Sequence, residues 1–300
     1  MIYLDEERVR SLLRWDGLID AMEAALTAFS SGRVQQPVRG ILTVEENKRY
    51  LGVMPAVTDD VMGAKLVSFY PGNEGTPFPT HNGVILLFDT RTGVPLAAMD
   101  GRLITEMRTA AVSAAATKYL MPENSRVLAV LGSGVQAHAH VEALAQVVEF
   151  AEIRVWSRTP EHARRFANEH GAIAVDAEAA VRGADVVVVV TSSQTPVLRG
   201  AWLKPGAHVN AVGANRPAWR ELDDAAMTNT LLVDSRASAA LESGDVILSN
   251  ASIYAEIGEL FAGKADAPPR STTTVFKSLG LAVEDLAAAK LVYGAAQPIH

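Results

Sequence analysis

Three small residues with a fixed spacing follow a short apolar segment near the middle of the chain. The segment from Val127 to Leu131 is apolar, and Gly132, Gly134 and Ala137 come directly after it. In this G-x-G-x-x-A pattern the first glycine allows a tight turn, and the second leaves out a Cβ that would strike a bound phosphate. The small third residue lets the next helix pack against the strand. The pattern predicts a turn whose backbone N–H groups bind a pyrophosphate.

The segments after this turn repeat an alternation of helix and strand. We expect a helix from Val135 to Val148 and a second strand from Glu152 to Trp156, which closes a βαβ unit of about thirty residues. Apolar, β-branched segments with helix-length spacers predict a Rossmann-type, doubly wound parallel sheet that binds a dinucleotide. The further elements that we expect are a helix over 176–182 and strands over 186–190, 208–212 and 231–234.

The end of the second expected strand indicates which dinucleotide binds. An NAD site usually carries Asp or Glu there, which accepts hydrogen bonds from the ribose 2′-OH. This chain has Ser157, Arg158 and Thr159 instead. A guanidinium can pair with a 2′-phosphate and hydroxyls can donate to it, whereas a carboxylate would repel it. We expect NADP(H) to be preferred and NAD(H) to be a weaker cofactor; the alternative is that Arg158 is only a solvated loop cation.

Length and composition fit an enzyme of two domains. The chain has 300 residues, is 49% hydrophobic and carries a net charge of −7. The negative charge argues against a broad nucleic-acid interface. No apolar segment is long enough to span a membrane, and the N-terminus lacks the basic region and apolar stretch of a signal peptide. We therefore expect a cytoplasmic protein.

Metal chemistry is not expected from the sequence. The chain has no cysteine, which excludes disulfides, thiolate nucleophiles and cysteine-based metal sites. The seven histidines are scattered. His138 and His140 are two residues apart on one expected helix, so they cannot share a face as ligands. We predict no metal site.

The first part of the chain is organised differently. A helix is expected from Trp15 to Ser31 and another from Thr105 to Leu120. Between them the pattern indicates four or five strands with short connections, so this sheet should be mostly antiparallel. A Gly- and Pro-rich stretch over 70–79 is a candidate lid or pocket edge. The expected strands cover 35–44, 49–55, 61–69, 84–88 and 94–99.

Three cations of this first part stand in apolar or small surroundings. Arg39 follows Gln-Pro-Val, Lys65 lies in Gly-Ala-Lys-Leu-Val, and Arg108 is followed by Thr109 and an alanine-rich segment. Lys and Arg are seldom buried unless they meet an anion. The alternative is that each extends its charged end to solvent. The small residues beside Arg108 favour a bound ligand there.

Several motifs, in the same order along the chain, give it a family resemblance. The chain resembles the ornithine cyclodeaminase/mu-crystallin family, and within it the mu-crystallin, ketimine-reductase branch. The motifs are Gln36-Pro-Val-Arg, Gly63-Ala-Lys, Arg108-Thr-Ala-Ala-Val-Ser, Gly132-Ser-Gly-Val-Gln-Ala, Val212-Gly-Ala-Asn-Arg-Pro-Ala-Trp-Arg-Glu-Leu-Asp-Asp, Glu242-Ser-Gly-Asp-Val-Ile-Leu and Thr274-Val-Phe-Lys-Ser-Leu-Gly-Leu-Ala-Val-Glu-Asp.

The resemblance implies a homodimer and a division of labour between two domains. Residues 1–120 would bind substrate and form the dimer contact, with 281–300 returning to them as a helix, and residues 121–280 would bind the dinucleotide. It also implies that basic residues at the positions of Arg39, Lys65 and Arg108 hold the substrate carboxylate. The positions expected to contact the cofactor are Thr109, Gly132, Ser133, Gly134, Val135, Gln136, Ser157, Arg158, Thr159, Thr191, Val212, Gly213, Ala214 and Gly280.

One departure from the family pattern separates the activities. Cyclodeaminases of the family carry an aspartate two residues after the glycine of the Val-Gly motif, where this chain has Asn215. An amide cannot take up a proton at neutral pH, so it cannot act as that general base. Ornithine cyclodeamination is therefore disfavoured, whereas reduction of an imine needs no such base.

The sequence therefore predicts hydride transfer from NADPH to the C=N carbon of a small cyclic 2-imino acid. Δ1-Pyrroline-2-carboxylate would give L-proline, and Δ1-piperideine-2-carboxylate would give L-pipecolate. Lys65 and His81 are the candidate proton donors, and Asn215 should reach the reacting groups. His81 as a packed structural residue is an equally good interpretation. The alternatives are an alanine-dehydrogenase-like or opine-type dehydrogenase, an ornithine cyclodeaminase, and a non-enzymatic mu-crystallin-like binding protein.

Overall fold

The computed structural model describes residues 1–46 and 48–297, which fall into two compact units. One unit comprises residues 1–108 and the segment from Gly280 onward, and the other spans Thr109–Leu279. The boundary lies inside helix α3 (Arg102–Leu120), twelve residues before the expected boundary after residue 120. The reason is that Thr105 and Arg108 contact the first unit, whereas Ser113 and Thr117 contact the second.

The first unit is built on a six-stranded sheet in the order β1-β6-β5-β4-β3-β2. Strand β1 runs parallel to β6 and the other neighbours are antiparallel, so the expected mostly antiparallel sheet is confirmed. The strand expected from residue 35 begins only at Gly40, because Gln35 forms an isolated bridge with Val57 and Pro37 has no N–H to donate. The strands are β1 (Ile2–Leu4), β2 (Gly40–Glu45), β3 (Arg49–Val57), β4 (Val61–Phe69), β5 (His81–Asp89) and β6 (Pro95–Asp100).

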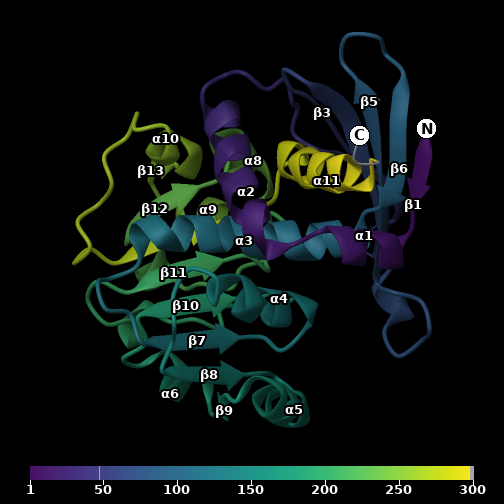
Figure 1. Cartoon of the computed structure of the whole chain (residues 1–300). Helices are drawn as coiled ribbons and strands as arrows, with labels where there is room; N and C mark the ends of the chain where they lie inside the picture. Colours follow the sequence, from purple (N-terminus) through teal and green to yellow (C-terminus); the bar gives the residue numbers. More distant parts are fainter. Residues whose placement is uncertain (47, 298–300) are drawn as a thin grey trace. The chain divides into compact units, whose positions relative to one another are not determined.

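Helix α11 (Ala282–Ala296) lies against β3, β4 and β5 of this sheet and against α2 (Trp15–Ser30) (Figure 1). Close approach requires Gly63 on β4, where a Cβ would lie 2.0 Å from Leu86 O and 3.1 Å from Leu286 of α11. The start of α11 is fixed by Gln36, whose Oε1 accepts a hydrogen bond from the Val283 N–H. The remaining helices of the unit are α1 (Glu6–Leu12) and the short η1 (Pro71–Asn73).

The second unit holds an eight-stranded, all-parallel sheet in the order β13-β12-β14-β11-β10-β7-β8-β9. The predicted fold class, a Rossmann-type parallel sheet beside a mostly antiparallel one, is confirmed. Strand β14 was not expected, because Thr274 and Lys277 at its ends are polar and a polar stretch precedes it. The strands are β7 (Val127–Leu131), β8 (Glu152–Trp156), β9 (Ile173–Ala174), β10 (Val186–Val189), β11 (His208–Ala211), β12 (Thr230–Val233), β13 (Ile253–Glu256) and β14 (Thr274–Lys277).

Strand β7 has β8 on one side and β10 on the other, so the chain reverses its direction of winding there. Ligands of open parallel sheets bind outside the carboxyl ends of the strands at such a point. No helix in the described part of the chain is long and apolar enough to cross a membrane. The other helices of the unit are α4 (Val135–Leu144), α5 (Pro160–His170), α6 (Ala177–Val181), η2 (Gly200–Trp202), α7 (Asp224–Met227), α8 (Arg236–Glu242), α9 (Gly244–Ser249) and α10 (Ile257–Phe261).

Candidate functional site

The glycine turn after β7 has the geometry that its sequence pattern predicts. Gly132 has φ +121°, and a Cβ there would lie 2.7 Å from the Val190 carbonyl oxygen that follows β10. Gly134 caps α4, and a Cβ built on it meets nothing within 4 Å. Ala137 is fully buried. The turn therefore presents a helix N-terminus to open space, which fits a dinucleotide phosphate group.

The end of β8 lies beside this turn. The Ser133 hydroxyl donates a 2.9 Å hydrogen bond to the Ser157 hydroxyl, which joins the two neighbouring strand ends. Thr159 caps α5, and the Arg158 side chain is exposed. Val135 and Gln136 form the first turn of α4. These predicted cofactor residues thus gather at the carboxyl ends of β7 and β8.

A buried carboxylate joins the ends of β10 and β11. Oε1 of Glu221 accepts hydrogen bonds of 2.6 Å from both the N–H and the hydroxyl of Thr191, and Oε2 accepts one of 2.8 Å from the Ala214 N–H. Gly213 lies between these groups, where a Cβ would be 2.0 Å from Thr191 O. Glu221 therefore holds the segment from Val212 to Ala214 in place.

A second buried pair supports Glu221. Oδ1 of Asp245 accepts hydrogen bonds from the N–H groups of Glu221 and Leu222, and Oδ2 lies 3.0 Å from the Lys277 ammonium. Both Asp245 and Lys277 are fully buried. Burial raises the pKa of Glu221 to about 7, and the positive charge of Lys277 only partly opposes this.

Asn215 comes directly after this supported segment, four residues beyond the end of β11, and is exposed. It therefore lies on the carboxyl edge of the parallel sheet, as its position in the sequence predicts. The Ala214 N–H donates to Glu221, so the backbone directly before Asn215 is held by the buried network.

In the other unit, two of the three predicted cations share one carboxylate. The Lys65 ammonium on β4 lies 2.7 Å from Asp285 Oδ2, and Nε of Arg108 on α3 donates to Asp285 Oδ1 at 2.9 Å. Nη1 of Arg108 donates to Glu284 at 2.7 Å. The two cations are 2% and 4% exposed and both acids are fully buried, so neither cation extends to solvent.

Arg39 joins the same group through the backbone of Gly280. Nη2 of Arg39 donates a 2.9 Å hydrogen bond to Gly280 O. Gly280 has φ +82°, and a Cβ there would lie 2.5 Å from Nη1 of Arg108. Gly280, which was predicted to contact the cofactor, thus packs between Arg39 and Arg108, and a cofactor contact for it stays a prediction.

The electrostatics of this group act on Lys65. Burial lowers the pKa of Lys65 to about 8; Asp285 opposes the shift, and Arg108 and Arg39 add to it. The Lys65 ammonium also donates to the Thr105 hydroxyl at 3.3 Å. We call Arg39, Lys65, Arg108, Glu284 and Asp285 the charge cluster. Lys65 and Arg108 are buried, whereas Arg39 is half-buried.

His81 lies apart from the charge cluster. It is exposed at the start of β5, pairs with Phe69 in the sheet and lies against the Phe69 ring in a tilted arrangement, with 4.7 Å between centroids. Ile85, the partner of Lys65, is four residues further along β5, a distance of about 13 Å. The structure therefore brings together Arg39, Lys65 and Arg108 but not His81.

Comparison with known proteins identifies the family. The model of the ornithine cyclodeaminase/mu-crystallin family matches residues 2–298. The chain belongs to this family. Its members include a ketimine reductase mu-crystallin of Mus musculus, which is 51% identical over 301 residues, or 97% of this chain and 96% of that protein. The family resemblance of the sequence motifs is thus confirmed.

Two solved structures of related proteins have the same fold. The Δ1-pyrroline-2-carboxylate reductase of Thermococcus litoralis, in complex with NADH and L-proline, has a TM-score of 0.93 at 34% identity, covering 99% of this chain and 97% of that one. An archaeal alanine dehydrogenase dimer with bound NAD has a TM-score of 0.92 at 34% identity, covering 98% and 95%. The family members that resemble this chain thus include enzymes with different substrates.

The Glu221 network generates a prediction about stability. In Glu221→Gln an amide –NH2 replaces one carboxylate oxygen and meets either Thr191 or Ala214, both of which are donors. We expect the free energy of unfolding to fall by roughly 1–3 kcal/mol at pH 7, the cost of an unsatisfied buried donor. Urea titration checks this, with the exposed Glu149→Gln as the matched control.

The pH dependence of the same variants separates ionisation from packing. Because the folded-state pKa of Glu221 is raised to about 7 from 4.5, the folded state retains the proton longer than the unfolded state does. The stability that Glu221 contributes should therefore be lost as pH rises from about 4.5 through 7. This decline should be absent in Glu221→Gln. An equal decline in the variant and the wild type contradicts the assignment.

Proposed function

We propose that this chain catalyses the NAD(P)H-dependent reduction of a cyclic 2-imino acid to the corresponding L-amino acid. The substrate class is that of Δ1-pyrroline-2-carboxylate and Δ1-piperideine-2-carboxylate, with L-proline and L-pipecolate as products. The observation that carries the proposal is the charge cluster, in which Arg39, Lys65 and Arg108 come together. The names of the mouse and Thermococcus relatives support the same class of reaction.

The three cations of the cluster suit a substrate with one carboxylate. A carboxylate can accept hydrogen bonds from guanidinium groups, and nearby positive charge stabilises it. Arg39 is half-buried and donates a hydrogen bond to Gly280 O. We expect Arg39 and Arg108 to hold the substrate carboxylate and so to orient the ring.

Lys65 is the better candidate for the proton that the ring nitrogen takes up. With a pKa of about 8 it is protonated at neutral pH and gives up its proton more readily than an ordinary lysine. Asp285, at 2.7 Å, holds the ammonium in place. His81 stays the alternative donor. The bound nicotinamide supplies the hydride, and the contribution of the chain is to bind, orient and protonate the imine.

The cofactor preference and the assembly are parts of the same proposal. The exposed Arg158 with Ser157 and Thr159 favours NADP(H), with NAD(H) as a weaker cofactor. We expect a homodimer, in line with the dimeric alanine dehydrogenase relative. That relative also makes oxidation of an open-chain amino acid the second candidate function.

The first test of function compares substrates directly. We expect NADPH oxidation with five- or six-membered cyclic 2-imino acids and no ammonia release from L-ornithine, because Asn215 has no basic oxygen to accept a proton. Spectrophotometry at 340 nm and an ammonia assay measure the two reactions. L-Alanine with NAD+ is the third substrate pair. Faster turnover of ornithine or alanine than of the imines would contradict the proposal.

The variant Asn215→Asp sharpens this comparison. A carboxylate at the edge of the sheet restores the group that family cyclodeaminases carry. We expect imine reduction to fall and a trace of ornithine turnover to appear. Asn168→Asp, at an exposed position on α5 of the same unit, is the matched control and should leave both rates unchanged.

A second test uses the pH dependence of Lys65. If Lys65 supplies the proton, kcat/KM should decrease as pH rises through about 8, because the lysine then loses its proton. In Lys65→Arg the guanidinium keeps its proton and is a much poorer donor, so kcat/KM should be lower and the part of this decrease that is due to Lys65 should disappear. The imine titrates identically for both proteins, so their difference isolates Lys65. Identical pH profiles would exclude Lys65 as the donor.

A third test concerns the 2′-phosphate. Arg158→Ala should weaken NADPH binding by about 1–3 kcal/mol, the range of a charge-assisted hydrogen bond, and leave NADH binding almost unchanged. Fluorescence titration with each cofactor measures this. Arg165→Ala, an exposed arginine on α5, is the control. Equal losses for the two cofactors would show that Arg158 does not contact the 2′-phosphate.

A further inference from the structure

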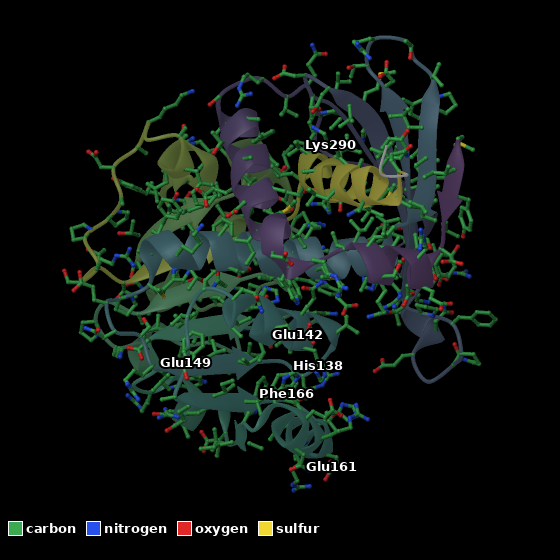
Figure 2. The ribbon with its side chains drawn as sticks, viewed as in Figure 1. His138, Glu142, Glu149, Glu161, Phe166 and Lys290 are labelled. Carbon is green, nitrogen blue, oxygen red and sulfur yellow. The ribbon has the colours of Figure 1, made fainter. Side chains whose placement is uncertain are left out.

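Two histidines and a glutamate from neighbouring helices of the parallel-sheet unit come together at its surface. His138 lies on α4, and Glu169 and His170 end α5. Nδ1 of His138 is 2.7 Å from Nε2 of His170 and 3.7 Å from Oε2 of Glu169. One ligand atom from each residue lies within 4.8 Å of the others. Figure 2 shows His138 beside Phe166 of α5.

We propose that His138, Glu169 and His170 form a binding site for a divalent transition-metal ion of the zinc class. Two imidazole nitrogens and one carboxylate oxygen are a donor set that Zn²⁺ accepts, with water in the fourth position. The same set suits Co²⁺, Ni²⁺ and Cu²⁺, whereas Mg²⁺ and Ca²⁺ prefer oxygen ligands. The proposal is independent of the reaction that the enzyme catalyses.

The spacing of the three ligand atoms is close to what such an ion needs. Ligands at about 2.0–2.1 Å around a tetrahedral ion are about 3.3 Å apart. The distances of 2.7 and 3.7 Å lie on either side of this value. A shift of about half an ångström in the two imidazole rings would therefore admit the ion. A change of tautomer gives both facing nitrogens a free lone pair.

The surroundings hold the rings but leave the site accessible. Phe166 is almost fully buried and contacts both imidazoles, with ring centroids 4.7 Å from His138 and 4.5 Å from His170. Side-chain exposure is 31% for His138 and 50% for Glu169, so an ion can enter from solvent. Gly171, with φ +62°, ends α5 directly after His170. Glu169 and His170 therefore both lie in the last turn of α5. The long Glu169 side chain reaches toward the same point as the His170 imidazole.

The sequence alone gave no sign of this group, because its members are separated by 32 residues along the chain. Considered on its own helix, His138 has only His140 as a neighbouring histidine. His140 is fully buried and contacts the Ser113 hydroxyl and the Gln136 carbonyl, so it serves a different purpose. Only the packing of α4 beside α5 makes His138 and His170 neighbours.

An ion at this point would join two helices that begin at the cofactor segments. Helix α4 begins at Gly134 of the glycine turn, and α5 begins at Thr159, next to Arg158. Binding to the folded state alone raises the thermal midpoint by mass action. We therefore expect zinc to stabilise the protein against heat as well as to bind it.

The experiment uses the full chain after treatment with EDTA and removal of the chelator. Calorimetric titration with ZnCl2 should give one ion per chain, and CoCl2 should give the visible absorption of a low-symmetry Co²⁺ site. His138→Asn and His170→Asn should each weaken zinc binding by at least about tenfold, and Glu169→Gln by less. His162→Asn replaces an exposed histidine of α5 and should leave zinc binding unchanged.

Several results would contradict the proposed zinc site. Zinc binding that is unsaturable, or that His138→Asn and His170→Asn leave unchanged, would overturn it, as would an equal loss in His162→Asn. Thermal unfolding in EDTA shows whether each variant folds. Glu169 is exposed, so Glu169→Gln together with His170→Asn keeps the test decisive if His138→Asn does not fold.

Discussion

The cost of burying charge governs the arrangement of the first unit. Lys65 and Arg108 are held out of water, and an unpaired charge in that position would be strongly destabilising. Their partners, Glu284 and Asp285, lie about 176 residues further along the chain than Arg108. The segment after Gly280 must therefore return to the antiparallel sheet. Gly63, Gln36 and the left-handed Gly280 all serve this close return.

In the parallel-sheet unit the buried group that needs partners is an acid rather than a base. There a buried carboxylate, Glu221, accepts hydrogen bonds from two strand ends, and the Asp245–Lys277 pair fixes it from behind. A carboxylate can join several N–H donors at one point because its two oxygens accept several hydrogen bonds. The network thus holds the backbone directly before the exposed Asn215. In both units buried charge places backbone and side chains where a ligand is expected.

Much of this was predictable from local patterns. The glycine turn, the parallel alternation and the cations at Lys65 and Arg108 are each marked by residue types that are unusual in their surroundings. Glu284 and Asp285 were missed because acids in the first turn of a helix are common and give no sign of burial. Glu221 lies in a polar stretch typical of a surface loop. The partners of His138 were missed because they depend on which helices pack together.

The separation of these cations and acids along the chain also determines which unit can fold first during translation. When Lys65 and Arg108 have left the ribosome, the carboxylates that pair with them have not yet been made. The parallel-sheet unit, by contrast, is continuous from Thr109 to Leu279 and carries its own partners for Glu221 and Lys277. Nascent chains can complete that unit while the antiparallel sheet waits for α11. The first unit to be translated is thus the last to be finished.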